Sequence, residues 1–309
     1  MESRRVSENA VSGSGKSIPL VGAAWALGAA FMAAAFVVPW KLATPHGEEA
    51  ASVLVLLVSA AILNTMLLPF TRHAGARFSP AALKLTAILA ILTLLGNYAS
   101  AAAIERVSAP LLNVMQRAEL LVVALVAWIA LGERPHWLFW VGGGVAALGF
   151  AWMQVAAADG MLDAGGMFYG ILSALSFGTM TVAVRHFIPG VDAVFVNAMR
   201  LWASVLLWFV LNGGIPDSMS FSREHLLFAS LAGFTGPFLG RLFTMQSSRY
   251  LEARFTSLIL LASPVFAMPM AWLAMGEVPS AHEVEGGAVM LIGIAIPLIG
   301  MLRRQSGSR

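Results

Sequence analysis

The sequence predicts an all-α integral membrane protein with ten transmembrane helices, arranged as two inverted repeats of five helices each. Three observations lead to this fold class. First, 59% of the 309 residues are hydrophobic and only 11% are charged, whereas about a quarter of the residues in soluble domains carry charge. Second, apolar runs of membrane-spanning length follow one another with short polar breaks between them. Third, the turn Gly132-Glu133-Arg134-Pro135 returns 144 residues later as Gly276-Glu277-Val278-Pro279.

The elements are predicted in order from the N-terminus. Residues 1–17 are rich in serine, glycine and charge, which predicts a disordered tail. The apolar run after it is longer than a signal-peptide core and leads into further spans rather than a cleavage site, so it is predicted to be a retained first helix. Each later run is long enough to cross about 30 Å of hydrocarbon. The predicted spans are 18–40, 50–70, 81–103, 108–131, 136–157, 165–185, 193–212, 225–247, 254–275 and 284–302.

The repeat organises these spans into two units. The first covers residues 18–157 and the second covers residues 158–302, with a basic tail at 303–309. At the constant offset of 144 residues, Trp128 falls on Trp272 in register with the two Gly-Glu turns. Because each unit holds five helices, the second copy is upside down in the membrane. In transporters with such inverted repeats, the substrate site lies near the bilayer midplane between the two halves.

The basic residues in the predicted loops indicate the orientation, because cytoplasmic loops carry an excess of lysine and arginine. One side of the membrane holds only Lys41, Arg106 and Arg223. We therefore expect both termini in the cytoplasm. The basic residues on the cytoplasmic side are Arg4, Arg5, Lys16, Arg72, Arg77, Lys84, Arg134, Arg185, Arg249, Arg254, Arg303, Arg304 and Arg309.

Several classes of function lack the residues they need. The sequence has no cysteine, and its six histidines show no spacing typical of metal ligands. Neither a nucleophile with an adjacent base nor a phosphate-binding loop is visible, so we expect no enzyme activity, no catalytic residue, no metal and no cofactor. The basic residues are scattered rather than gathered into a stripe, so we expect no nucleic-acid partner.

The fourth span carries the clearest candidate site. Glu119 is the only acidic residue away from the ends of a predicted span, and a charge near the bilayer centre costs about 2.5–3.5 kcal/mol on insertion scales. Helical rotation of 100° per residue places Asn113, Gln116, Arg117 and Glu119 on one polar wedge. We predict that these four side chains bind substrate, with Arg117 holding a carboxylate or phosphate and Glu119 binding substrate or a proton. Structural ion pairing and helix-to-helix hydrogen bonding remain the alternatives.

A second set of candidates comes from the repeat. Arg241 in the eighth span falls on Asn97 in the third, beside Tyr98, and inversion would bring these positions to opposite sides of one cavity. We predict that Asn97, Tyr98 and Arg241 bind substrate, with snorkelling toward the cytoplasm as the alternative for Arg241. For Arg200, snorkelling is the favoured interpretation. Trp25 and Tyr169 are candidates for the cavity wall, with simple packing as the alternative.

Two recurring glycine patterns have structural interpretations. The glycine of each Gly-Glu turn is expected to end a helix, and the proline is expected to begin the next. Glycines also recur every seven residues in the fifth and tenth spans, at 142 and 149 and at 286, 293 and 300. This spacing predicts close helix packing, either within the bundle or between two protomers of a homodimer.

The span from about residue 18 to 302 resembles the drug/metabolite transporter superfamily, in its ten-helix branch built of two EamA-type repeats. The resemblance rests on LGERP at 131–135 and VGGGVAALG after it, on MGEVP at 275–279 and EGGAVMLIG after it, and on Ser263-Pro264-Val265-Phe266. It implies a bundle in which helices 1, 3, 4, 6, 8 and 9 surround a central cavity. The chain departs from the pattern in helix 4, where Leu120 falls on Pro264 and Arg117 and Glu119 replace Leu261 and Ser263.

The expected function is secondary-active transport in the bacterial inner membrane by alternating access. We predict export of small polar metabolites such as amino acids or organic anions, with a proton or a counter-substrate as the coupling partner. The alternatives are a multidrug exporter of cations, in which Glu119 is the counter-charge, and a lipid-handling or non-transporting membrane protein. The expected partners are therefore a small-molecule substrate and the lipid bilayer.

Overall fold

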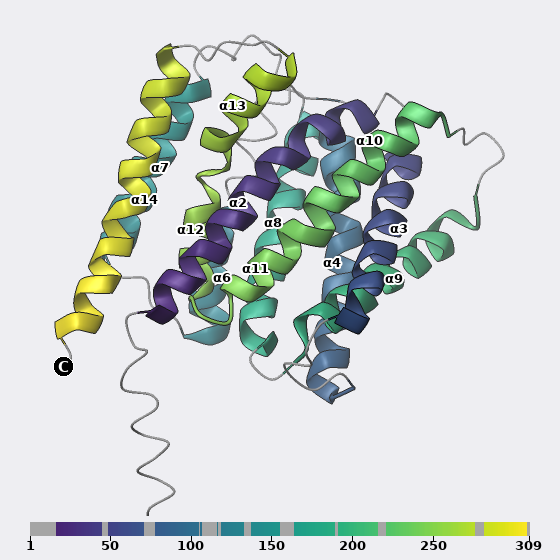
Figure 1. Cartoon of the computed structure of the whole chain (residues 1–309), viewed down its shortest axis with the longest axis horizontal. Coiled ribbons are helices and arrows are strands. Elements are labelled where there is room, and N and C mark those ends of the chain that lie inside the picture. The colour runs from purple at the N-terminus through teal and green to yellow at the C-terminus, as the bar shows by residue number, and fades with distance from the viewer. Residues whose placement is uncertain are drawn as a thin grey trace, which may run out of the picture.

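The computed structural model describes residues 17–44, 49–70, 78–104, 106, 116, 119–132, 137–154, 164–188, 191–215, 221–275 and 281–307. Helices account for nearly all of them (Figure 1). In chain order they are α2 (Ser17–Ala43), α3 (Glu49–Leu67), the short η1 (Leu68–Phe70), α4 (Pro80–Ile104), α6 (Glu119–Leu131), α7 (Trp137–Gln154), α8 (Ala164–Phe187), α9 (Ala193–Asn212), α10 (Arg223–Gly233), η4 (Phe234–Gly240), α11 (Arg241–Ser247), α12 (Ala253–Leu260), α13 (Ser263–Met275) and α14 (Ala281–Gly307).

In the described residues each predicted span corresponds to a helix or to consecutive helical segments, which confirms the all-helical membrane fold. Residues 108–115 and 117–118 of the fourth predicted span lie outside the described residues. Seven of the described helical segments are long and apolar enough to cross a membrane, and α7 and α14 contribute shorter apolar stretches. Local signals fix several ends: the Asp192 carboxylate accepts from the backbone amides of Val194 and Phe195 at the start of α9, and Gly132 adopts a φ of 67° directly after α6. The glycine of the first Gly-Glu turn therefore ends its helix as predicted.

Two spans are less regular than a continuous α-helix. The eighth consists of α10, the π-helical segment η4 and α11, and η4 contains Pro237, which has no backbone N–H to donate. The ninth is divided into α12 and α13 by a turn at residues 261–262, just before Pro264. At the other end of the chain, α14 continues to Gly307, so residues 303–307 of the predicted tail are helical.

The two halves of the chain repeat each other in space as well as in sequence. Helices α3, α6 and α7 have counterparts 144 residues later in α9, α13 and α14. The packing repeats too: α4 packs on α8 and α9, just as α10 to α11 pack on α2 and α3. Likewise α6 packs on α8, as α12 and α13 pack on α2, while α3 pairs with α9 and α7 with α14. The inverted repeat predicted from the sequence is therefore present in the fold.

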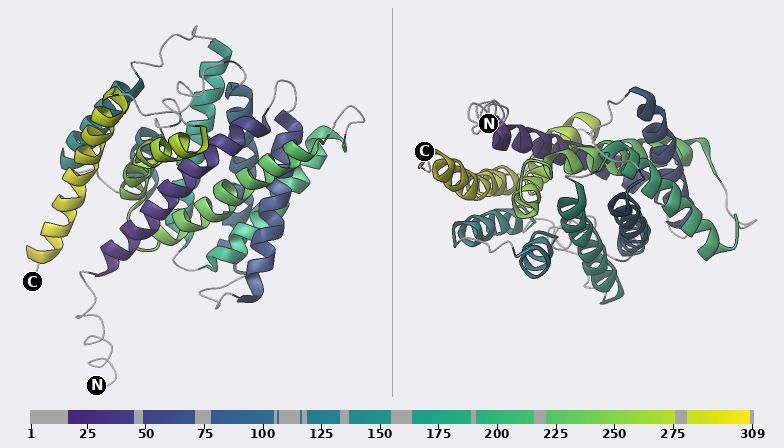
Figure 2. Two further views of the ribbon diagram at one scale, coloured as in Figure 1. Left: turned by 45° about the horizontal axis from the view of Figure 1, so that its top comes forward. Right: turned by 90° about the horizontal axis from the view of Figure 1, so that it is seen from below.

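Helices α7 and α14 form a pair at one edge of the molecule (Figures 1 and 2). Glycines allow their backbones to approach closely. A Cβ atom on Gly142 would lie 2.5 Å from the carbonyl oxygen of Gly293, and one on Gly149 would lie 2.6 Å from that of Gly286. The seven-residue glycine spacing is thus used for packing inside one chain, the first of the two predicted uses.

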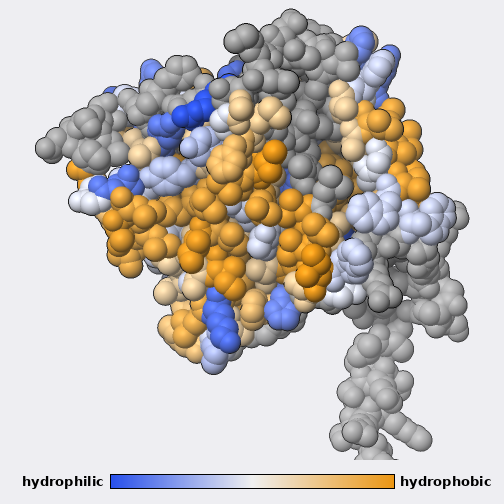
Figure 3. Space-filling view, turned by 180° about the vertical axis from the view of Figure 1, so that it is seen from behind, coloured by the Kyte–Doolittle hydropathy of each residue, from blue (hydrophilic) through white to orange (hydrophobic). Residues whose placement is uncertain are grey.

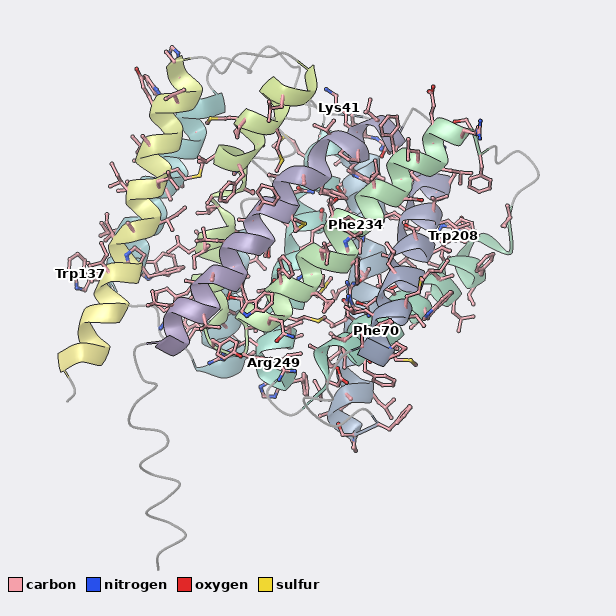
Figure 4. All side chains as sticks on the ribbon, in the orientation of Figure 1. Lys41, Phe70, Trp137, Trp208, Phe234 and Arg249 are labelled. Atoms are coloured by element: carbon pink, nitrogen blue, oxygen red, sulfur yellow. The ribbon has the colours of Figure 1, made fainter. Side chains whose placement is uncertain are left out.

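The remaining helices surround the centre of the bundle and expose an apolar face. Figure 3 shows hydrophobic residues in a broad band across the back of the molecule, with hydrophilic residues above and below it. Lys41 and Arg249 lie near opposite ends of the helices (Figure 4), as expected of charged residues that flank a membrane span. The start of α2 and the end of α14 lie at the same end of the bundle (Figure 1).

Candidate functional site

A cavity of about 180 Å³ lies between the two repeats. It is lined by α2, α4, α8, α9, η4, α11 and α12, together with Gln116 and Glu119, so helices of both repeats contribute to its wall. Most of the lining residues come in pairs that are 144 residues apart. The pairs are Ala33 and Phe177, Phe36 and Met180, Thr93 and Pro237, Asn97 and Arg241, Ser100 and Thr244, and Gln116 and Leu260. The cavity therefore lies where equivalent positions of the inverted repeats face each other, which is where such folds place substrate.

Four predicted site residues meet at this cavity: Asn97, Gln116, Glu119 and Arg241. The Asn97 side chain is buried and donates to the backbone carbonyl of Thr93, one turn earlier in α4. The Gln116 amide donates to the hydroxyls of Ser100 (3.1 Å) and Ser173 (3.4 Å). Gln116 thus joins the third and sixth spans at the wall of the cavity.

Arg241 is half-buried and is the first residue of α11. Its guanidinium lies over the ring of Phe177, with the central carbon 5.9 Å from the ring centroid. Within the described part of the chain it has no hydrogen-bond or ion-pair partner. A guanidinium has five N–H donors, so Arg241 presents unused donors and a positive charge to the cavity.

Glu119 lies in α6, at the edge of its described residues, and is half-buried. Its carboxylate accepts a hydrogen bond of 3.1 Å from the Thr181 hydroxyl in α8. It also lies within electrostatic range of Arg241 without pairing with it directly. Among the described residues, the site therefore contains a carboxylate and a guanidinium that border one cavity without bonding directly to each other.

The structure contradicts the snorkelling expectation for Arg200. Its side chain is 1% exposed and lines the cavity from α9. The guanidinium donates to the Asn197 carbonyl oxygen (2.7 Å), to the Thr93 hydroxyl and to the backbone carbonyl of Pro237 (2.8 Å). These partners come from three different helical segments, so the sequence pattern of the seventh span alone could not predict them. The one available signal was Asn197, one turn before Arg200.

Three other predicted residues, Tyr98, Trp25 and Tyr169, do not line this cavity. The Tyr98 hydroxyl accepts from Asn212 and its ring packs against the apolar cluster around α3 and α9, because adjacent helical residues point about 100° apart. Trp25 is 36% exposed and contacts Phe243 edge to face. Tyr169 lies under the Arg106 guanidinium. The cavity-wall expectation for Trp25 and Tyr169 is therefore not met here. Asn113 and Arg117 lie outside the described residues.

Comparison with known proteins agrees with this geometry. The model of the EamA-like transporter family matches the chain twice, over residues 20–154 and 164–299. No curated protein shows significant sequence similarity to the chain. A solved structure described only as a crystal structure of a protein is similar, with 17% sequence identity and a TM-score of 0.67 over 94% of this chain and 98% of the other. At this identity the similarity shows the fold alone.

Proposed function

Because the chain belongs to the EamA-like transporter family and is a multi-pass membrane transporter of the drug/metabolite type, we propose that it moves small anionic metabolites through the central cavity by alternating access. Amino acids and organic anions are the substrates in view. One observation carries the proposal. Arg241 faces the cavity and has no hydrogen-bond partner among the described residues, and a guanidinium binds carboxylates and phosphates through paired hydrogen bonds.

The size and polarity of the cavity support a small substrate. Its volume of about 180 Å³ is below the roughly 300–1,000 Å³ that is usual for pockets holding drug-sized ligands. The polar groups of Asn97, Ser100, Gln116 and Thr244 are distributed around the wall and provide groups that can orient a polar molecule. The Phe177 ring and the Met180 thioether of α8 provide apolar surface beside these polar groups.

Uptake into proteoliposomes tests the proposal. Purified protein is reconstituted, and labelled amino acids, labelled organic anions and a labelled quaternary amine are offered in parallel. The expected result is protein-dependent movement of an anionic or zwitterionic compound and none of the amine. Movement of the amine alone would overturn the anionic assignment in favour of cation efflux, with Glu119 as the counter-charge. Faster scrambling of labelled lipid with no solute movement would favour the lipid-handling alternative.

We propose that the protein lies in a bacterial-type inner membrane with both termini on the cytoplasmic side. The proposed direction of transport is export of the substrate from the cytoplasm. The bias of lysine and arginine between the two sets of loops supports this orientation. The ends of α2 and α14 on the same side of the bundle are consistent with it (Figure 1).

Glu119 is the proposed coupling residue, and the Glu119→Gln variant separates charge from hydrogen bonding. The amide oxygen of the introduced glutamine can still accept from Thr181, so the fold should be retained. Arg241 loses a neighbouring negative charge that competes with substrate, so anion affinity should rise by about fivefold, corresponding to roughly 1 kcal/mol. Titration calorimetry measures the affinity.

The same Glu119→Gln variant should move substrate by exchange but no longer respond to an imposed proton gradient in proteoliposomes. Thr181→Val, which removes the hydrogen bond but keeps the carboxylate, is the matched control and should still respond to the gradient. A Glu119→Gln protein that remains gradient-driven would remove Glu119 from the coupling mechanism.

A further inference from the structure

A second buried arginine borders the cavity, and its charge is not neutralised by its hydrogen-bond partners. Arg200 donates to an amide oxygen, a hydroxyl and a backbone carbonyl. None of these three acceptors is anionic. Burial of an unpaired charge is costly even where neutral dipoles solvate it. Because this cost is not offset by an anionic partner among the three acceptors, a fixed positive charge at this position indicates a functional role.

The network around Arg200 holds that charge in one place. Asn197, which accepts from the Arg200 Nε, itself donates to the Asn64 side chain (2.9 Å), and Asn64 donates to the backbone carbonyl of Val194 (2.7 Å). All of these side chains are buried. Each member of the network is thereby restrained by the next, and the guanidinium cannot follow a substrate as a free side chain would.

The position of Arg200 is tied to the repeat. Its partners Thr93 and Pro237 are 144 residues apart and occupy equivalent places in the third and eighth spans. Pro237 lies in the π-helical segment η4, and such irregular turns are frequent at functional sites. The residue equivalent to Arg200 in the first repeat is Leu56, which is fully buried in the apolar core. The charge is therefore present once, at a point where the two repeats meet.

Arg200 and Arg241 also lie within electrostatic range of each other. Both border the cavity, where Glu119 is the acidic residue of the described wall. These two arginines and Glu119 give the described wall a formal charge of +1 when the carboxylate is ionised and +2 when it is protonated. Two negative charges on a bound molecule would balance the two guanidinium groups when Glu119 is protonated.

The geometry points to Arg200 as a specificity-determining residue that selects substrates carrying two negative charges, either a dicarboxylate or a phosphate monoester. This inference rests on the proposed function and deepens it. Arg241 binds one anionic group through its unused donors. Arg200 supplies a fixed positive potential for the second anionic group. A molecule with a single negative charge can therefore interact with only one of the two arginines.

The test compares molecules of equal size and different charge on the purified full-length protein. Succinate, succinamate and succinamide carry two, one and no negative charges, and glycerol 3-phosphate represents the phosphate monoesters. Titration calorimetry should give a Kd for succinate, for glycerol 3-phosphate or for both that is about tenfold or more below that for succinamate. Binding of succinamide should be the weakest. Tighter binding of succinate would identify the substrate as a dicarboxylate, and tighter binding of glycerol 3-phosphate would identify it as a phosphate monoester.

Variants separate the charge of Arg200 from its structural role. In Arg200→Gln the advantage of the dianion over succinamate should fall to within about threefold, while the Kd for succinamate changes by less than about threefold. Arg200→Lys keeps the charge and should keep most of the advantage. Arg223→Gln removes an exposed arginine at the start of α10 and should change nothing. If Arg200→Gln lost affinity equally for the dianions, succinamate and succinamide, the role of Arg200 would be structural rather than selective.

The outcomes for the two proposals are distinguishable. If succinamate binds wild-type protein as tightly as both dianions, the selectivity inference is overturned while anion transport stands. If no anion binds or moves, the proposed function itself fails. Should Arg200→Gln not fold, the ratio of affinities in the wild-type protein still decides the question.

Discussion

Replacing Arg241 with glutamine should abolish transport of anionic substrates and weaken their binding by about thirtyfold or more. The reason is that a charge-assisted contact in a largely desolvated site is worth about 2 kcal/mol or more when one partner is removed. Because Arg241 has no hydrogen-bond partner in the described part of the chain, its loss leaves no described group without its hydrogen bond. The variant should therefore fold normally, and proteoliposome uptake with titration calorimetry measures the effect.

Arg223→Gln is the matched control for this prediction. Arg223 is an exposed arginine at the start of α10, in the same span as Arg241, so it reports the effect of losing one positive charge away from the cavity. Its transport should equal that of the wild type. Unchanged anion binding in Arg241→Gln, or equal losses in both variants, would show that Arg241 does not hold the substrate.

Replacing Gly142 with alanine should destabilise the protein by about 1–3 kcal/mol, the usual cost of overpacking a well-packed contact. The added methyl group would meet Pro297 and the backbone of Gly293 in α14. Neither neighbour is the flexible end of a side chain, so the two helices must separate. Thermal unfolding in detergent measures the change, read as a lower Tm than that of the wild type.

Gly144→Ala, in the same helix, should raise the stability of the protein rather than lower it. A Cβ atom at Gly144 would have no heavy atom within 4 Å, and the residue is exposed. Removal of glycine from a helix interior without a clash is favourable by about 0.5–1 kcal/mol. Equal stability of the two variants would mean that α7 and α14 do not pack closely in the membrane.

The sequence was sufficient to predict the number and order of the helices because the membrane imposes a minimum apolar length on every span. The repeat followed from the constant offset between the two Gly-Glu turns, and the inversion followed from the odd number of helices in each repeat. The same offset brought Asn97 and Arg241 together at the cavity, because equivalent positions of inverted repeats meet on the axis that relates them. These inferences needed only spacing along the chain.

Contacts between helices were harder to predict. Arg200 lies close enough to a predicted helix end to snorkel, and its true partners, Thr93 and Pro237, belong to other helices. Tyr98 is next to Asn97 in sequence, yet the helical rotation turns it toward α9. The turn at residues 261–262 had a visible signal in the proline at position 264, since the residues before a proline tend to leave the helical conformation, but hydropathy alone shows one continuous span.

The two proposals differ in what they require of the cavity. Transport of small anions requires Arg241 and an opening to each side of the membrane in turn. Selection of dianions additionally requires the fixed charge of Arg200. Arg200 is held by hydrogen bonds, whereas Arg241 has no hydrogen-bond partner among the residues that the structure describes. We therefore expect Arg200 to determine which anions bind and Arg241 to determine whether any anion binds.

The most direct test of the central claim is the accessibility of the cavity from each side of the membrane. The protein has no cysteine, so Ser100→Cys and Thr244→Cys can be made singly without other changes. These two residues are 144 positions apart and line the same cavity, and each lies near the C-terminal end of its span. Since the two spans run in opposite directions in an inverted repeat, the two positions are expected toward opposite membrane faces. Leu206→Cys, on the exposed surface of α9, serves as the lipid-facing control.

A membrane-impermeant thiol reagent should reach the Ser100→Cys protein from one face and the Thr244→Cys protein from the other, and bound succinate or glycerol 3-phosphate should slow both reactions. The Leu206→Cys control should not respond to either compound. Reaction of both cavity variants from one face only, or no reaction of either, would contradict alternating access through a cavity between the two inverted repeats.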